Sequence, residues 1–180
     1  MQEQERFFVV TGGPGSGKTT LIDALSAKGL RAMPEAGRAV IKDQTATGGS
    51  ALPWGDQAAF AEAMLSRDLQ SFQDASDAEG TVLFDRGLPD LVGYLTLCGL
   101  PVPAHFLKAV RSFRYNRTVF IAPPWPEIFR QDEERKQSVE EARQTFDAMV
   151  RAYTVFGYEL IHLPLAPVPD RASFVLERIS

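Results

Sequence analysis

Short apolar runs alternate along the chain with longer stretches in which apolar residues recur at helical spacing. The apolar runs lie near residues 6–11, 30–34, 81–87, 118–122 and 158–163. The stretches with helical spacing lie near residues 18–29, 61–72, 88–97, 105–113, 139–156 and 170–179. Runs this short are typical of buried strands, and the helical spacing predicts helices that pack against them. Strands that alternate with helices predict an α/β fold with a parallel sheet covered on both faces.

Glycine and proline mark where several of these elements end. Gly80 interrupts the helix before the third strand, Pro123 stops the fourth strand, and Gly157 closes the long helix before the fifth. Residues 43–56 read DQTATGGSALPWGD and are rich in turn formers. That composition predicts a loop, which we expect to be mobile.

The first apolar run leads directly into the sequence GGPGSGKTT. Gly12, four further residues and then Gly17-Lys18-Thr19 have the spacing of a phosphate-binding loop, and the order strand, loop, helix is its proper context. A glycine-rich turn that binds nothing is the alternative, which the agreement of motif and context disfavours. Backbone N–H groups of such a loop and the start of the following helix attract phosphate groups. The expected nucleotide-binding residues are Gly12, Gly13, Pro14, Gly15, Ser16, Gly17, Lys18, Thr19 and Thr20.

This loop predicts ATP and Mg²⁺ as cofactors. Lys18 would reach the β- and γ-phosphates, and the Thr19 hydroxyl would hold the metal ion. Residues 163–173, after the fifth strand, would lie near the adenine, with core packing as an equal alternative.

Charged residues stand where two of the predicted strands end. Ligands of such sheets bind beyond the carboxyl ends of the strands. Glu35 follows the second strand, with Arg38 one helical turn later, and Asp85-Arg86 ends the third. Asp85 is a candidate Mg²⁺ ligand, either carboxylate is a candidate base for an acceptor hydroxyl, and Arg86 would clamp a phosphate or the acceptor. Surface ion pairs are the alternative reading of these charges.

A cluster of cations follows the fourth strand. Arg130, Arg135 and Lys136 lie in a segment, about residues 125–138, that would fold over a bound triphosphate as a lid. The two arginines are the stronger candidates. A solvated helix start with glutamate–arginine pairs is the alternative.

Composition narrows the class of protein. The chain has 180 residues, 44% hydrophobic and 23% charged, which predicts one domain over residues 1–180. A net charge of −4 without a basic block argues against a nucleic-acid partner. Cys98 is the only cysteine, so no internal disulfide forms. No apolar run is long enough to span a bilayer and no signal pattern begins the chain, so we expect a cytoplasmic protein.

Four motifs together resemble the P-loop kinases of nucleosides and nucleotides, within the AAA-type family that includes ribosylnicotinamide-kinase-like domains. They read GGPGSGKTTL, PEAGR, LFDRGLPD and APPWPEIFRQDEERKQS. The resemblance covers nearly the whole chain and implies a three-layer α/β/α fold with a five-stranded parallel sheet in the order 2-3-1-4-5. PEAGR stands where the familiar nucleoside kinases carry a Glu-Pro pair, and DRG differs from them in its third residue.

The same resemblance assigns roles to several positions. It places Asp85 on the metal side, Glu35 on the acceptor side, and Arg130 and Arg135 in the lid. It also implies that about residues 43–77 cover the acceptor. Within that segment an aromatic ring and a glutamine would hold a planar base, although Phe60 and Met64 fit helix packing better. The covering residues considered are Trp54, Gln57, Phe60, Met64 and Arg67.

Two functions from different classes follow from these residues. The first is an ATP-dependent kinase that transfers the γ-phosphate to a hydroxyl of a nucleoside-like or other small metabolite. The alternative is a regulatory ATPase or nucleotide-dependent switch that acts on a protein partner. The guanine-reading Asn-Lys-x-Asp motif and the LSGGQ signature are absent, which disfavours a GTPase switch and an ABC-type ATPase. Two carboxylates at strand ends and a cationic lid favour the kinase.

Overall fold

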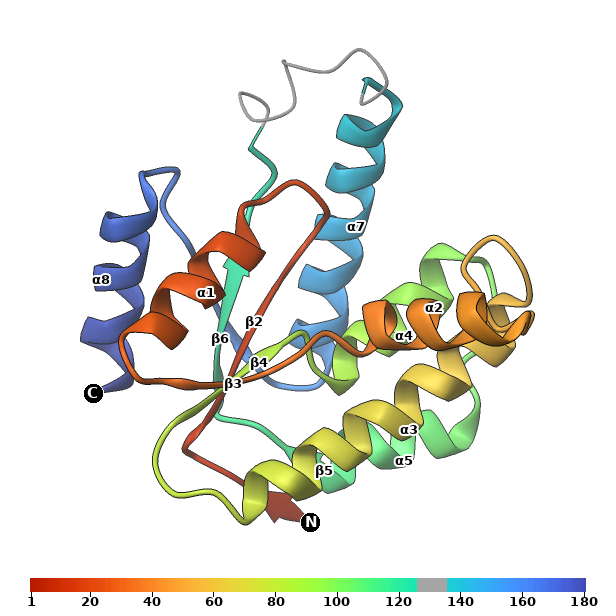
Figure 1. Ribbon diagram of the computed structural model, residues 1–180, viewed down its shortest axis with the longest axis horizontal. Helices are drawn as coiled ribbons and strands as arrows, with labels where there is room; N and C mark the ends of the chain where they lie inside the picture. The colour runs from red at the N-terminus through yellow and green to blue at the C-terminus, as the bar shows by residue number, and fades with distance from the viewer. Residues whose placement is uncertain (126–135) are drawn as a thin grey trace.

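The computed structural model describes residues 1–125 and 136–180, the side chains of residues 136–138 excepted. The elements in chain order are β1 (Gln2–Glu3), β2 (Phe7–Gly12), α1 (Lys18–Ala27), β3 (Arg31–Met33), α2 (Ala36–Thr47), α3 (Gln57–Ser76), β4 (Val82–Asp85), α4 (Leu88–Leu97), α5 (Ala104–Ser112), β5 (Phe113–Arg114), β6 (Thr118–Ala122), α7 (Lys136–Val155), β7 (Glu159–His162) and α8 (Val168–Ile179). Figure 1 shows their arrangement.

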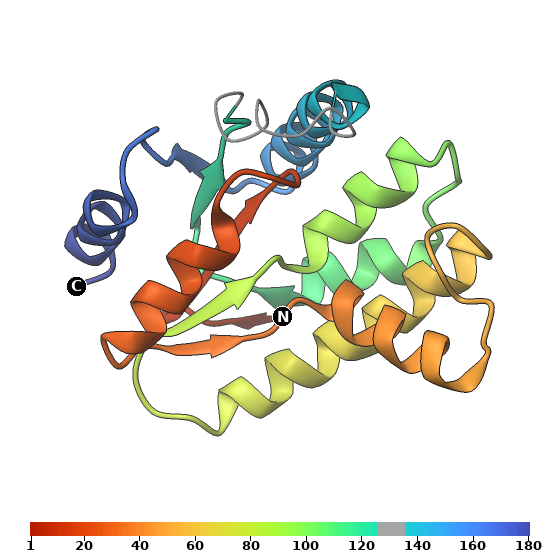
Figure 2. The same cartoon turned by 45° about the horizontal axis from the view of Figure 1, so that its top comes forward.

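Five strands form one parallel sheet with helices on both faces. The strand order is β3-β4-β2-β6-β7. Counted along the chain among themselves, these strands run 2-3-1-4-5, so the predicted α/β fold is confirmed. Helices α1 and α8 lie on one side of the sheet, and α3, α4, α5 and α7 lie on the other (Figures 1 and 2). The parallel pair of β1 and β5 is a separate, unexpected ribbon.

Alternate residues of the central strand enter two different cores. Phe7 and Val9 pack into the larger core beneath α3, α4, α5 and α7, whereas Phe8 and Val10 pack into the smaller core beneath α1 and α8. Because side chains of a strand point alternately to the two faces, a continuous apolar run is what a doubly covered strand requires. Each such side chain contributes about 1.5–3 kcal/mol when fully buried.

The loop predicted over residues 43–56 was wrong for its first five residues. Helix α2 continues to Thr47 and ends at Gly48, whose φ of 71° is the left-handed conformation that glycine adopts easily. Most of the polar side chains in residues 42–47 are exposed, so their composition reflects a solvated helix face. The loop covers residues 48–56, and Asp56 caps α3 by accepting a hydrogen bond from the N–H of Ala59 at 3.0 Å.

The carboxyl ends of β2, β3 and β4 meet at one edge of the sheet, where the segment between β2 and α1 turns back over the strands (Figure 1). This edge is where side chains that follow parallel strands converge. No helix in the described ranges has an apolar stretch long enough to cross a membrane.

Candidate functional site

The loop between β2 and α1 has the backbone shape of a phosphate cradle. Gly15 and Gly17 have φ of 67° and 75°, so the chain curls with left-handed residues before the helix begins. Gly12, with φ of 141°, leaves no room for a Cβ, which would come within 2.5 Å of the Ala122 carbonyl oxygen. The Ser16 hydroxyl donates to the Gly13 carbonyl at 2.8 Å. The predicted loop therefore adopts a shape suited to phosphate.

A fully buried arginine of α8 donates a hydrogen bond to the backbone of the phosphate loop. Arg171 is 0% exposed, and its guanidinium donates to the Ser16 carbonyl at 3.0 Å. Its Nε and second terminal nitrogen make no hydrogen bond to the described residues, and burial lowers the pKa of the group. Residues 163–173 were expected near the nucleotide or in the core, and Arg171 is both buried and in contact with the phosphate loop.

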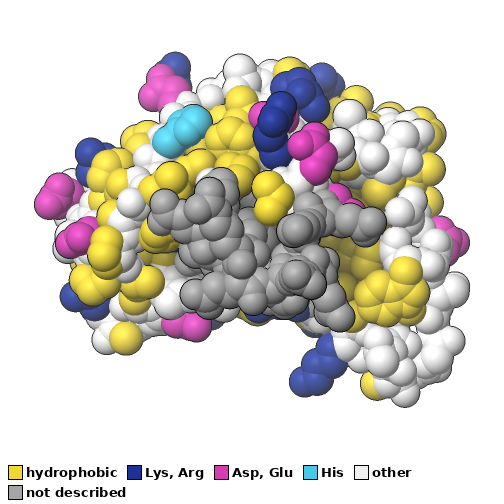
Figure 3. All heavy atoms as spheres, turned by 90° about the horizontal axis from the view of Figure 1, so that it is seen from above, with side chains coloured by type: hydrophobic (Ala, Val, Ile, Leu, Met, Phe, Trp, Pro, Cys, Tyr) yellow, Lys and Arg dark blue, Asp and Glu magenta, His cyan; other side chains and the backbone are white. Residues whose placement is uncertain are grey.

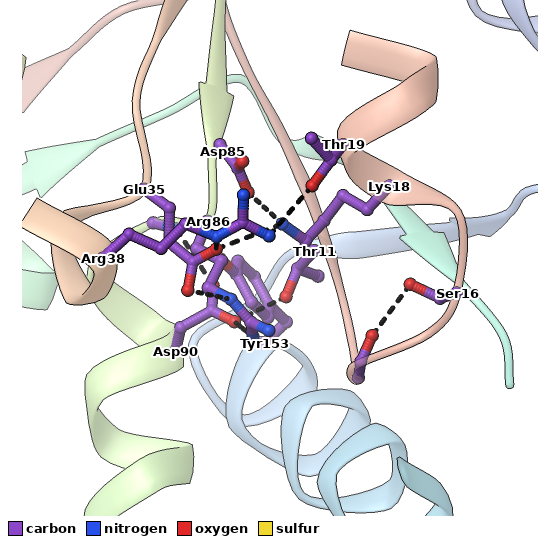
Figure 4. Close-up of polar contacts among 12 residues, drawn as sticks. Thr11, Ser16, Lys18, Thr19, Glu35, Arg38, Asp85, Arg86, Asp90 and Tyr153 are labelled. Carbon is purple, nitrogen blue, oxygen red and sulfur yellow. Dashed lines mark hydrogen bonds and ion pairs between the residues drawn. The ribbon is translucent and has the colours of Figure 1, made fainter. Parts of the chain in front are cut away.

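Lys18 lies at the centre of the site between the carboxylates of Asp85, the last residue of β4, and Glu35, which links β3 to α2. Its ammonium donates to Asp85 and lies 3.7 Å from a Glu35 carboxylate oxygen, while only 6% of the residue is exposed (Figure 4). Burial raises the pKa of Asp85, and the neighbouring Lys18 ammonium offsets part of that rise. The structure thus brings together three residues that the sequence analysis selected separately.

Arg86 bridges two carboxylates from an unusual backbone conformation. Its φ of 68° is left-handed, which non-glycine residues adopt at a cost and which is often found at functional sites. The guanidinium lies 3.4 Å from Glu35 and 3.4 Å from Asp90. Burial alone would lower the pKa of Arg86, but the carboxylates of Asp90 and Glu35 outweigh it and raise that pKa. Arg38 also reaches this group, 3.4 Å from Glu35 and 3.1 Å from the Thr19 hydroxyl.

Asp90 is the fixed anchor beneath Arg86, and the sequence analysis did not select it. It accepts hydrogen bonds from the Thr11 hydroxyl, the Tyr153 hydroxyl and the Gly87 N–H, in addition to its ion pair with Arg86 (Figure 4). Burial, followed by the Asp90 charge, raises the pKa of Tyr153 well above its usual value, so the phenol stays a donor. Both carboxylate oxygens of Asp90 are therefore saturated by the protein itself.

The side chains around Asp90 leave no room for a side chain at position 87, which is a glycine. A Cβ at Gly87 would lie 3.0 Å from the Tyr115 ring, 3.0 Å from the Tyr153 hydroxyl and 3.0 Å from Val9. We expect Gly87→Ala to lower the free energy of unfolding by about 1–3 kcal/mol, because three packed groups must move. Chemical denaturation measures the change. Gly93→Ala is the matched control, since a Cβ there meets the flexible end of Met149. Equal losses in both variants would contradict this account of the third position of DRG.

A cavity of about 710 Å³ opens beside these charges. Pro14 of the phosphate loop lines it together with the charged residues Glu35, Arg86 and Asp90. The apolar part of its lining comes from α2, α3, α4 and α7. It includes Ile41, Phe60, Met64, Leu91, Tyr94, Leu97 and Met149. In Figure 3, which looks down on the molecule from the top of Figure 1, hydrophobic side chains gather in a hollow toward the right.

The residues proposed to cover an acceptor divide into two groups. Gln57, Phe60 and Met64 line the cavity, and Phe60 and Met64 are also part of the larger core. Trp54 is 71% exposed and does not line the cavity. Arg67 points elsewhere and pairs with Asp43 on the surface. The helical phase of α3 explains this division, because Arg67 lies off the buried stripe that carries Phe60 and Met64.

Asp68 is a second cavity residue that the sequence analysis missed. It lies on the buried stripe of α3, four residues after Met64 and four before Phe72, and it is 7% exposed. Burial, followed by the charges of Asp90 and Glu35, raises its pKa well above the usual value. A carboxyl on the apolar stripe of a helix was a detectable signal.

A smaller recess of about 400 Å³ adjoins the first cavity and shares Glu35 and Arg38 with it. Thr19 and Asp85 also line this recess. A hydroxyl and a carboxylate are oxygen ligands of the kind that Mg²⁺ prefers, and protein sites for Mg²⁺ commonly use one or two such groups beside substrate phosphates. The residues therefore fit the predicted metal ion. Arg130 and Arg135 lie outside the described residues.

Comparison with known proteins identifies the family. A sequence model described as an AAA domain matches residues 7–171. The chain belongs to this family. No protein of curated function matches this AAA domain.

Solved structures place the AAA domain among P-loop kinase-like folds. Deoxyadenosine kinase from M. mycoides with bound dATP has a TM-score of 0.56 at 14% identity, over 96% of this chain and 98% of that one. Shikimate kinase from Acinetobacter baumannii in complex with shikimate has 0.55 at 15%, over 96% and 92%. NadR protein in complex with NR has 0.71 at 18%, over 96% of this chain and 50% of NadR, so the AAA domain spans half of NadR. Identities this low show the fold alone.

Proposed function

We propose that this chain is an ATP-dependent kinase that transfers the γ-phosphate of ATP to a hydroxyl of a small, nucleoside-like or related metabolite. One observation carries the proposal. Pro14 of the phosphate loop and Glu35 line the same cavity, which is large enough for a small organic molecule. A nucleotide-dependent switch needs a phosphate site, but it does not need a second chamber beside that site.

The positions of the two carboxylates support separate roles for them. Glu35 lines the large cavity, where an acceptor would bind, whereas Asp85 lines only the recess with Thr19. Glu35 would accept the proton of the acceptor hydroxyl while the oxygen of that hydroxyl forms a bond to the γ-phosphorus. The bond from that phosphorus to the β–γ bridging oxygen breaks, and ADP leaves. Arg86 and Lys18 would neutralise charge on the phosphoryl group.

Thr19 and Asp85 would hold Mg²⁺ under this proposal. The ion would neutralise charge on the β- and γ-phosphates when bound. Lys18 contacts Asp85 and Glu35 in the structure. Triphosphate oxygens would compete with these carboxylates for the ammonium, which would free Asp85 for the metal side.

We also propose that residues 1–180 act as one domain, with about residues 43–77 covering the acceptor. Helix α3 supports this assignment because it contributes Gln57, Phe60 and Met64 to the cavity.

The regulatory ATPase remains the second candidate, and an ADP-release assay separates the two. Release should rise severalfold when a suitable hydroxylated acceptor is added to the protein with Mg·ATP. Release that ignores every nucleoside and hydroxylated metabolite, yet rises with a protein partner, would favour the regulatory function instead.

The lid hypothesis rests on the sequence motif. Arg130→Ala and Arg135→Ala should each lower kcat by at least about 10-fold and change ATP affinity little, because a lid acts chiefly on the transition state. Steady-state kinetics and calorimetry measure the two quantities. Arg117→Ala is the control, since Arg117 is exposed and pairs with Glu159 on the surface. Unchanged kcat in both lid variants would contradict the hypothesis.

A further inference from the structure

Two buried aspartates line the large cavity, and they differ in what satisfies them. Asp90 receives three hydrogen bonds and an ion pair from the protein. Asp68 is equally buried, but no described residue donates a hydrogen bond to its carboxyl, and only burial and neighbouring charges act on it. The Asp68 oxygens are not among the described side-chain atoms that are both fully buried and without a partner, so this carboxyl keeps access to the cavity that it lines.

Tyr94 also lines the cavity, but its hydroxyl is turned away from the accessible space. The Tyr94 hydroxyl oxygen is buried and forms no hydrogen bond with the described residues by geometry, although the Cys98 thiol is close to it. Its ring packs edge-on against Phe60 with centroids 5.6 Å apart. Asp68 therefore supplies a carboxyl to a wall that is mainly apolar and has Gln57, Gln144 and Thr145 as its uncharged polar side chains. A mainly apolar wall with a few polar groups is the usual composition of a site that orients a small ligand.

The charges around the cavity restrict the ligand further. Its acidic lining residues are Glu35, Asp68, Asp90 and Glu141. Its described cations are Arg86, paired with Glu35 and Asp90, and Arg38, paired with Glu35. An acceptor that carried a carboxylate or a phosphate monoester would meet an excess of acidic groups and no unpaired cation among the described residues.

We propose that Asp68 is a specificity-determining residue that hydrogen-bonds the acceptor, and that the cavity selects an acceptor without negative charge that carries a second hydroxyl or N–H group. This inference rests on the proposed function and names the substrate class of that site. The hydroxyl to be phosphorylated lies at Glu35, the second polar group meets Asp68, and the apolar part of the acceptor packs against Phe60, Met64 and Met149.

Binding and kinetics test this inference with paired probes. The panel consists of uncharged nucleosides and polyols, each with its phosphate monoester or carboxylic acid counterpart, titrated by calorimetry into the protein with Mg·ADP. At least one uncharged member should bind 10-fold or more tightly than its anionic counterpart. Asp68→Leu should weaken that binding by about 10- to 100-fold, which is the effect of one lost hydrogen bond in a buried site. Asp68→Asn, whose amide oxygen still accepts a hydrogen bond at the same place, should lose less.

Two controls separate recognition from stability. Asp74→Asn, on the exposed side of the same helix, should leave acceptor binding unchanged. ATP binding should be unchanged in both Asp68 variants, which also reports that they are folded. Where transfer occurs, the acceptor KM should rise with less change in kcat.

Any one of three results would overturn the inference. The anionic member of every pair could bind more tightly, no uncharged member could bind, or Asp68→Leu could leave acceptor binding unchanged. Binding of an uncharged acceptor that depends on Asp68, with no phosphorylated product, would refute the proposed kinase and leave this inference supported.

Discussion

Lys18→Ala should reduce ATP affinity by about 100-fold and abolish measurable turnover. The ammonium is buried at the phosphate loop, and hydrogen bonds to charged groups contribute about 1.5–3 kcal/mol each. Its removal would also leave the carboxylates of Glu35 and Asp85 facing the triphosphate without their shared cation. Repulsion would then add to the lost attraction. Isothermal calorimetry with Mg·ATP measures the affinity.

Two further variants make this result specific to the charge. Lys28→Ala removes an exposed lysine just past the end of the same helix and should bind ATP as the parent does. Lys18→Met keeps most of the side-chain volume and should lose affinity as Lys18→Ala does. Parental affinity in Lys18→Ala would show that the loop does not bind the triphosphate as described.

Glu35→Gln should lower turnover by about 100-fold or more while ATP affinity changes little. The amide keeps the size of the side chain but cannot accept the acceptor's proton as a carboxylate does. The Glu35 carboxylate lies beside three cations, at 3.4 Å from Arg86, 3.4 Å from Arg38 and 3.7 Å from Lys18. The amide would also weaken these ion pairs, so the acceptor KM should be measured together with kcat.

Glu62→Gln is the matched control for this substitution. Glu62 is an exposed residue of α3 that contacts His105, away from the cavity lining. It should retain the kinetics of the parent. Turnover in Glu35→Gln within about threefold of the parent would exclude Glu35 as the base and leave Asp85 as the candidate base.

The parts of the site that the sequence predicted are those that depend on local chain geometry. The glycines of the phosphate loop fix its shape within a few residues. Asp85 ends β4 and Glu35 follows β3 by two residues, and the carboxyl ends of these neighbouring strands must meet in a parallel sheet. The same rule explains why Lys18 meets both carboxylates. Strand order followed from the resemblance of the motifs to known kinases, because periodicity alone does not order strands.

The parts that were missed depend on contacts between distant elements. Asp90 is recognisable as an anchor only when Thr11, from β2, and Tyr153, from α7, are beside it. The first turn of α4 gave no sign of these partners. Asp68 was different, since its place on the apolar stripe of α3 was visible in the sequence. Residues 43–47 were predicted as loop, although they are part of α2, because solvent-exposed helix residues and loop residues share the same polar composition.

Detection of the transferred phosphate tests the central claim most directly. The parent protein is incubated with Mg·ATP and a panel of nucleosides, nucleotides and hydroxylated metabolites, and mass spectrometry quantifies ADP and every phosphorylated product. We predict at least one acceptor for which each ADP formed is matched by one phosphorylated acceptor, with both lost in Lys18→Ala. ADP formation without any phosphorylated acceptor across the panel, accompanied by stimulation by a protein partner, would contradict the account.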